Sequence, residues 1–152
     1  MVQLRKEDMR RVGDIWMMSI TPEAGTVKNS EARDVVLHDQ LVELGFPEFV
    51  ASCAPGHLFL TPAPDGSIRG PWRIAKNQVT EFVRPVVTDP NVAPNHGWRH
   101  RFKTVGMEVG MIPRILDAIQ GHKPRTTGDT YGDVTPRILA QEIGKHPRYE
   151  VE

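Results

Sequence analysis

The sequence predicts an α+β domain that is mainly α, with a small antiparallel β-sheet near the N-terminus. Two observations predict it: β-prone apolar runs are concentrated in the first forty residues, and the later segments carry apolar residues at helical spacing between capping residues. A length of 152 residues fits one domain. The contents of 39% hydrophobic and 25% charged residues are typical of a globular protein.

The sheet is expected from two short apolar runs, Ile15–Ile20 and residues 35–37, which a polar stretch with Pro22 and Gly25 separates. This pattern is typical of a β-hairpin with a long loop. Residues 39–52 follow with apolar residues at helical spacing, but Gly45 and Pro47 interrupt them. We therefore expect one broken helix or two short helices there.

Residues 54–70 are rich in Gly and Pro, which predicts a loop with at most one short strand at residues 58–60. A helix follows with Pro71 in its first turn. Its apolar residues fall on one face: Ile74, Val79, Phe82 and Val83. Three prolines between residues 85 and 94 then predict a connector.

Three more helices are expected after this connector. Asn95 is the predicted N-cap of the first, which runs to about Gly110 and carries a buried stripe of Trp98, Phe102 and Val105. Pro113 opens the second helix and Gly121 closes it. The last begins with an N-cap at Thr135 and a first-turn proline at Pro136, and ends at Gly144.

The sequence composition indicates where the protein is located in the cell. The N-terminal residues turn charged at once and no apolar run approaches membrane-spanning length, so we expect no signal peptide, no membrane partner and a cytoplasmic location. The single cysteine, Cys53, excludes an internal disulfide and a cysteine-based metal cluster within one chain.

Charge is balanced overall, with 19 basic and 19 acidic residues, but unevenly distributed. Residues 1–50 hold 6 basic and 9 acidic residues, whereas residues 99–125 hold 6 basic and 2 acidic residues. A polyanion site is therefore expected in residues 99–125. The simpler interpretation of that stretch is a solvated helix face.

The predicted helix after Asn95 carries the first candidate for chemistry. His96 and Arg99 lie three residues apart and share a helix face, which sets a titratable imidazole beside a permanently charged guanidinium. Such a pair suits a phosphate ligand. On its own the spacing is equally typical of a solvated helix face.

Two further motifs follow in a fixed order. Gly121-His122 lies 23 residues beyond Arg99, and Tyr131 lies nine residues beyond His122. Together with His96-x-x-Arg99-His100, these motifs resemble the C-terminal signature boxes of the tyrosine recombinases of the phage-integrase type. Residues 3–8 are similar to the family's segment that leads into its three-stranded sheet. Residues 25–38 resemble the hairpin whose lysine takes part in strand cleavage.

The resemblance implies a reaction with double-stranded DNA. Tyr131 would attack the scissile phosphodiester, form a 3′-phosphotyrosine and release a 5′-hydroxyl. Arg99 would stabilise the charge of the transition state, and His96 would accept the phenol proton. Lys28 would protonate the leaving oxygen, and His122 would donate a hydrogen bond to the phosphate. Because the bond energy is conserved in the phosphotyrosine, no metal or other cofactor is expected.

The resemblance also implies partners and boundaries. DNA contacts are expected from Arg101, Lys103, Lys123 and Arg125, and a synaptic homo-oligomer from the family's mode of action. The chain begins after the position of the family's first catalytic arginine, and no matching segment surrounds Arg5, Arg10 or Arg11. We therefore expect residues 1–152 to be a partial catalytic domain, without that box and without the N-terminal DNA-binding domain. Slow cleavage and weak DNA binding would follow.

Several site residues have alternative interpretations. Tyr131 is an ordinary tyrosine if it stands alone, and Tyr149 is a second candidate that lacks the preceding Gly-His. Lys28 fits a plain loop lysine, and His122 fits a histidine at a helix C-terminus. His100 is expected to be structural.

Alternative functions are also open. An inactive DNA-binding remnant of a prophage integrase would keep the fold and lose the reaction. A metal-dependent hydrolase would use His96, His100 and His122 as ligands, although Gly97 stands where H-E-x-x-H has its glutamate. If covering helices are missing, apolar surface should be exposed around Leu4, strand Ile15–Ile20 or residues 39–52, and this would favour self-association.

Overall fold

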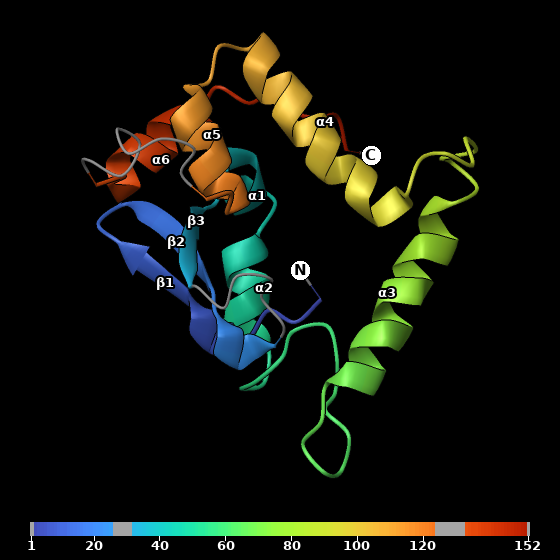
Figure 1. The fold of residues 1–152 in the computed structure, drawn as a ribbon. Helices are drawn as coiled ribbons and strands as arrows, with labels where there is room; N and C mark the ends of the chain where they lie inside the picture. Colours follow the sequence, from blue (N-terminus) through green and yellow to red (C-terminus); the bar gives the residue numbers. More distant parts are fainter. Residues whose placement is uncertain (1, 26–31, 124–132, 152) are drawn as a thin grey trace.

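The computed structural model describes residues 2–25, 32–123 and 133–151 (Figure 1). A three-stranded antiparallel sheet comes first, formed by β1 (Met9–Val12), β2 (Ile15–Ile20) and β3 (Arg33–Val36) in that order across the sheet. Short 3-10 turns precede and follow the first hairpin at Lys6–Asp8 and Pro22–Ala24. The helices are α1 (Asp39–Glu43), α2 (Phe46–Ser52), α3 (Arg69–Val83), α4 (Pro94–Glu108), α5 (Pro113–Gln120) and α6 (Pro136–Ile143).

The predicted hairpin is present. Strand β2 pairs with β3 in the register Met17 with Val36 and Ile20 with Arg33. Strand β1 was not predicted, although its signal is in the sequence. A two-residue turn at Gly13 and Asp14 joins β1 to β2, and Gly13 takes the positive φ of 63° that such hairpin turns require.

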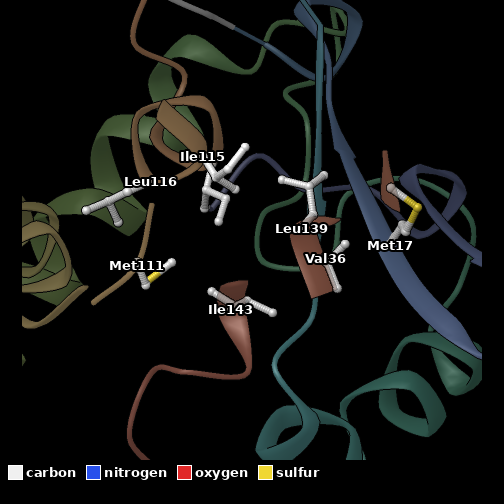
Figure 2. Close-up of a cluster of buried hydrophobic side chains, with 8 residues drawn as sticks. Met17, Val36, Met111, Ile115, Leu116, Leu139 and Ile143 are labelled. Atoms are coloured by element: carbon white, nitrogen blue, oxygen red, sulfur yellow. The ribbon is translucent and has the colours of Figure 1, made fainter. Parts of the chain in front are cut away.

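Both faces of the sheet are covered, because side chains alternate along a strand. Met17 of β2 belongs to the main core with residues of α5 and α6, and Figure 2 shows this cluster. Its buried members are Met17, Val36, Met111, Ile115, Leu116, Ile119, Leu139 and Ile143. The next residue, Met18, points to the other face and packs with Leu4 and Leu37 against residues of α1 and α2.

The segment 39–52 forms two short helices, as the sequence predicts. The break is at Gly45, which takes a left-handed conformation with φ of 80°. Pro47 does not interrupt the second helix. It lies in the first turn of α2, where its missing N–H costs no hydrogen bond.

The segment after α2 is a loop without a strand at residues 58–60, which agrees with the expectation of at most one short strand there. It makes one isolated bridge between His57 and Arg5, and the N–H of Leu58 donates to the carbonyl of Leu4 at 2.8 Å. These two contacts anchor the loop to the segment that enters β1. A single bridge does not extend into a ladder.

Helix α3 begins at Arg69, so Pro71 lies in its first turn as expected. Its apolar residues do not face a core. Ile74 is 59% exposed and Phe82 is 84% exposed. Figure 1 shows α3 standing apart from the sheet, beside the N-terminal end of α4. The periodicity identified a face of α3, but no described element packs against it.

Helix α4 starts two residues earlier than predicted, with Ala93 at the N-cap and Pro94 as the first helical residue. Asn95 is not the cap. Its side-chain amide donates to Thr80 Oγ1 at 2.6 Å and thereby joins α4 to α3. The expected buried stripe is also only partly correct, because Val105 is buried whereas Trp98 is 58% exposed.

The last two helices agree with the prediction. Gly121 ends α5 in a left-handed conformation with φ of 69°, and the Thr135 side chain accepts a hydrogen bond from the N–H of Ile138 at the start of α6. Both helices pack on β3. No helix in the described part of the chain is long and apolar enough to cross a membrane.

The expected exposed apolar surface is found at one of the three places named as alternatives, residues 39–52. Leu4 is 4% exposed, and the central residues of β2 are buried, so neither region is uncovered. Within residues 39–52 the expectation holds, since Leu41, Leu44 and Phe49 are exposed. The most exposed of the large apolar side chains are Phe82 on α3 and Val86 in the connector that follows it.

Candidate functional site

Three segments meet at the C-terminal end of α5. The Arg99 side chain of α4 donates from Nη2 to the carbonyl oxygen of Gln120 at 2.5 Å, and the Gln120 side chain donates back to the Arg99 carbonyl at 2.7 Å. Gln120 is buried. This reciprocal pair fixes α4 against α5, so the His96-x-x-Arg99 segment lies beside Gly121-His122.

His122 and Lys103 share one carboxylate beside Arg99. Asp117 Oδ1 lies 2.9 Å from His122 Nδ1 and 2.5 Å from Lys103 Nζ. Residues 99 and 103 are one helical turn apart, so both reach α5 from the same face of α4. The carboxylate orients the imidazole and offsets part of the local positive charge.

Arg33 approaches the same place from the first residue of β3. A Cβ added to Gly121 would lie only 2.7 Å from Arg33 Nη1, so the guanidinium rests directly on the Gly121 backbone. Arg33 is half-buried, and its Nε is buried without a hydrogen-bond partner among the described residues. Burial lowers the pKa of Arg33, and the charge of Arg99 lowers it further.

Local sequence features explain why basic side chains gather here. The C-terminus of a helix carries exposed carbonyls and a partial negative charge, which favour Lys, Arg and His in its neighbourhood. Gly121 ends α5 with a left-handed turn and has no side chain to block the approach of Arg33.

His96 and His100 lie one turn apart on α4. Both side chains are exposed, and their rings contact each other edge to face with centroids 4.6 Å apart. His122 bonds to Asp117. In the residues that the structure describes, no group of three His, Cys, Asp or Glu side chains could hold a metal ion. The metal-hydrolase interpretation therefore finds no support in the described geometry.

The other predicted DNA-binding residues are dispersed. The Arg101 guanidinium lies 5.7 Å from the centre of the Tyr149 ring, on the side of α4 that faces the C-terminal segment. Tyr149 is therefore close to Arg101 and His146. Lys123 is exposed just beyond His122. Three other predicted site residues, Lys28, Arg125 and Tyr131, lie outside the described residues.

The sequence interpretation missed Arg33 and Asp117 as parts of this cluster. The sequence contains a weak indication of Asp117, because this residue lies one helical turn before Gly121 and is therefore near His122, the residue after Gly121. Arg33 had none, since its position next to Gly121 depends on the packing of β3 against α5. Sequence spacing does not contain that contact.

No protein-family model, curated protein or solved structure matches this chain. Its residues and their geometry are therefore the basis for assigning a function. Within that geometry, the feature best suited to bind an anion is the cluster of Arg33, Arg99, Lys103 and His122 around the end of α5.

Proposed function

We propose that this chain cleaves and rejoins DNA through a covalent 3′-phosphotyrosine on Tyr131, in the manner of a tyrosine-recombinase catalytic domain. The observation that carries the proposal is the contact between Arg99 and the carbonyl of Gln120. It brings together two motifs, His96-x-x-Arg99 and Gly121-His122, that are separated by more than twenty residues in the sequence. A three-stranded sheet that precedes these helices also agrees with the resemblance.

The chemistry assigned to Arg99 follows from its side chain. Attack of the Tyr131 oxygen on phosphorus adds negative charge to the non-bridging oxygens, and a planar guanidinium binds two such oxygens at once. One Nη of Arg99 is bound to Gln120, which holds the group in a fixed orientation before substrate arrives. Preorganised donors of this kind lower a barrier without a reorganisation cost at the moment of reaction.

The Asp117–His122 pair suits the role of a hydrogen-bond donor to phosphate. With the proton of Nδ1 directed at the Asp117 carboxylate, a second proton on Nε2 makes the ring an imidazolium that can donate to an oxyanion. Asp117 then balances its charge. His96 as proton acceptor and Lys28 as proton donor to the leaving 5′-oxygen complete the reaction. The bond from phosphorus to that oxygen breaks as the bond to Tyr131 forms.

The partners in this proposal are double-stranded DNA and further copies of the chain. Balanced overall charge means that few phosphates are neutralised, so we expect modest affinity that decreases with salt. The exposed apolar side chains of α1 and α2, including Leu41, Leu44 and Phe49, offer surface for self-association.

The test is a nicked duplex with a 5′-bridging phosphorothiolate, which traps the covalent intermediate because the released thiol does not re-attack efficiently. We expect a protein–DNA adduct that survives denaturing electrophoresis. Tyr131→Phe should abolish the adduct, and Tyr149→Phe, the matched control at the second tyrosine, should leave it intact. Arg99→Ala should slow adduct formation by about 10²–10³.

Two outcomes would contradict this proposal. An adduct that persists in Tyr131→Phe or maps to Tyr149 would show that the nucleophile is misassigned. Binding of duplex DNA without any adduct, in the wild type and under all salt conditions, would support a DNA-binding domain that does not cut.

A further inference from the structure

Arg33 is the basic residue of the cluster at the end of α5 whose Nε is buried without a hydrogen-bond partner among the described residues. The other arginines of the N-terminal segment are paired: Arg5 bonds to the buried Asp8, and Arg10 forms an ion pair with Asp34 at 2.6 Å. Arg11 stacks over Trp16. Arg33 instead rests on Gly121 with its Nε buried and unpaired among the described residues.

The charge of the neighbouring Arg99 makes the charged form of Arg33 less favourable. Arg99 is close enough that its charge lowers the pKa of Arg33, in addition to the effect of burial. Asp117, the acidic residue of α5, is bonded to Lys103 and His122. Two guanidiniums are thus held together at a half-buried position without a carboxylate between them in the described part of the chain.

Such an arrangement is unfavourable until an anion occupies it. Like charges repel strongly where water is partly excluded, and a buried donor without a partner loses its hydration without compensation. A tetrahedral oxyanion removes both costs, because its oxygens accept from two guanidiniums at once. The polar backbone at the end of α5 positions both groups: Arg99 through the Gln120 carbonyl and Arg33 through contact with Gly121.

We propose that Arg33 and Arg99 together form a phosphate-binding clamp across the Gln120–Gly121 peptide, and that Arg33 supplies the second guanidinium for the phosphodiester that this chain acts on. This inference rests on the proposed function for the identity of its ligand. The clamp itself requires only an oxyanion of phosphate geometry.

The alternative role for Arg33 is a structural one, in which it stabilises the C-terminus of α5. The two roles predict opposite effects on stability in anion-free buffer. A clamp residue relieves repulsion when it is neutralised, so Arg33→Gln should unfold at the same temperature as the wild type or at a higher one. A structural arginine should instead lower the unfolding temperature when it is replaced.

The experiment measures thermal unfolding in phosphate-free buffer with added inorganic phosphate, and with chloride of equal ionic strength in a parallel series. We expect phosphate to raise the unfolding temperature of the wild type. Arg33→Gln and Arg99→Gln should each weaken phosphate binding at least tenfold, with Arg33→Lys between them and the wild type. Arg11→Gln makes the same charge change in the same sheet and should bind phosphate normally.

The trapping duplex distinguishes a failure of the Arg33–Arg99 clamp from a failure of the proposed DNA cleavage. Arg33→Gln should slow Tyr131 adduct formation by about 10²–10³, as loss of one oxyanion donor does. An adduct formed at the wild-type rate by Arg33→Gln would overturn the role in cleavage while leaving the proposed function intact. Phosphate binding unaffected by Arg33→Gln, or a lower unfolding temperature of that variant in anion-free buffer, would overturn the clamp regardless of DNA cleavage. Arg33-dependent phosphate binding without any adduct would overturn the assignment of DNA as the ligand.

Discussion

Gly121 is the residue whose replacement tests the cluster geometry most directly. Gly121→Ala faces backbone strain at φ of 69° and a Cβ that would contact the Arg33 guanidinium at 2.7 Å. The matched control is Gly110→Ala, which has φ of 73° and no atom within 4 Å of the new Cβ. We expect both variants to lose about 1–2 kcal/mol of stability from the left-handed conformation.

Only Gly121→Ala should also weaken phosphate binding, because only there does the methyl group displace Arg33. Urea unfolding gives the stability loss, and the phosphate-dependent shift in unfolding temperature gives the affinity. Equal phosphate affinity in the two variants would show that Arg33 does not depend on Gly121 for its position.

His146 provides a prediction on pH. The ring is buried, stacks on Phe102 at 4.9 Å between centroids, and has an Nε2 without a hydrogen-bond partner among the described residues. Burial lowers the pKa of His146 below 6.5, and the charges of His38 and Arg101 act in the same direction. The unfolded chain therefore takes up a proton that the folded chain excludes, so stability falls as the pH decreases through 6.5.

His146→Phe preserves the stacking and removes the titration. We expect the free energy of unfolding of this variant to vary less between pH 7.5 and pH 5.5 than that of the wild type. His100→Gln, at an exposed histidine, should retain the wild-type dependence. Guanidinium unfolding at a series of pH values is the measurement, and identical slopes for all three proteins would contradict the assignment to His146.

At the level of elements, Glu142 joins α6 to the start of α5. Its buried carboxylate accepts from the N–H of Ile112 at 2.7 Å and from Lys145 Nζ at 2.8 Å. Burial by itself would raise the pKa of Glu142, but the bonds from Lys145 and Ile112 outweigh it, and the pKa is lowered. The stabilisation is therefore present above the ordinary glutamate pKa of 4.5 and is lost as the pH falls through the lower folded value.

We expect Glu142→Gln to lower the free energy of unfolding at pH 7 by about 1.5–3 kcal/mol, which is the range for hydrogen bonds to a buried charge. The difference from wild type should shrink below pH 4. Glu43→Gln, which removes the exposed ion pair with Arg148, should cost much less than Glu142→Gln. A Glu142→Gln loss equal to that of Glu43→Gln would show that the link between α5 and α6 contributes little.

The elements that the sequence predicted well are those with local signals. Gly121 and the Thr135-Pro136 pair mark helix ends through backbone chemistry that needs no partner, and both were confirmed. The face of α3 was identified correctly, but periodicity indicates a face and not what covers it. The exposure of Phe82 and Trp98 depends on where α3 and α4 lie relative to the core, which is a tertiary property.

The candidate site likewise combines features with a local sequence signal and features that depend on tertiary packing. The proximity of Arg99 to His122 followed from the order of motifs, and the structure brings the Gln120 carbonyl to Arg99. Arg33 could not be predicted, because 66 residues separate it from Arg99 and its contact is made through Gly121. Spacing along one helix is visible in a sequence, whereas packing between a strand and a helix end is not.

At the scale of the whole molecule, the core and the candidate site share one framework. Helices α5 and α6 share one buried cluster with the sheet, which includes Met17, Leu116 and Ile143 and is drawn in Figure 2. The basic cluster lies at the end of α5, so it is supported by the best-packed part of the chain. Helix α3 stands outside this framework in Figure 1 and packs beside α4.

Charge distribution at this scale determines how DNA binding responds to salt. The chain has 19 basic and 19 acidic residues, so a general attraction to a polyanion is not expected. Binding should depend on the few phosphates that reach Arg33, Arg99 and nearby exposed residues such as Lys123. Two to four neutralised phosphates give a slope of about −2 to −4 for the logarithm of the binding constant against the logarithm of salt concentration.

Fluorescence anisotropy with a labelled duplex between 50 and 200 mM NaCl measures this slope. Arg33→Gln should make it shallower by about 1, the contribution of one phosphate contact. Arg11→Gln, on the sheet away from α5, should leave the slope unchanged. A slope steeper than about −6 would require a basic surface larger than the cluster at the end of α5. A slope that responds equally to Arg11→Gln and Arg33→Gln would mean that the charge of the sheet as a whole, and not the Arg33–Arg99 clamp, holds the DNA.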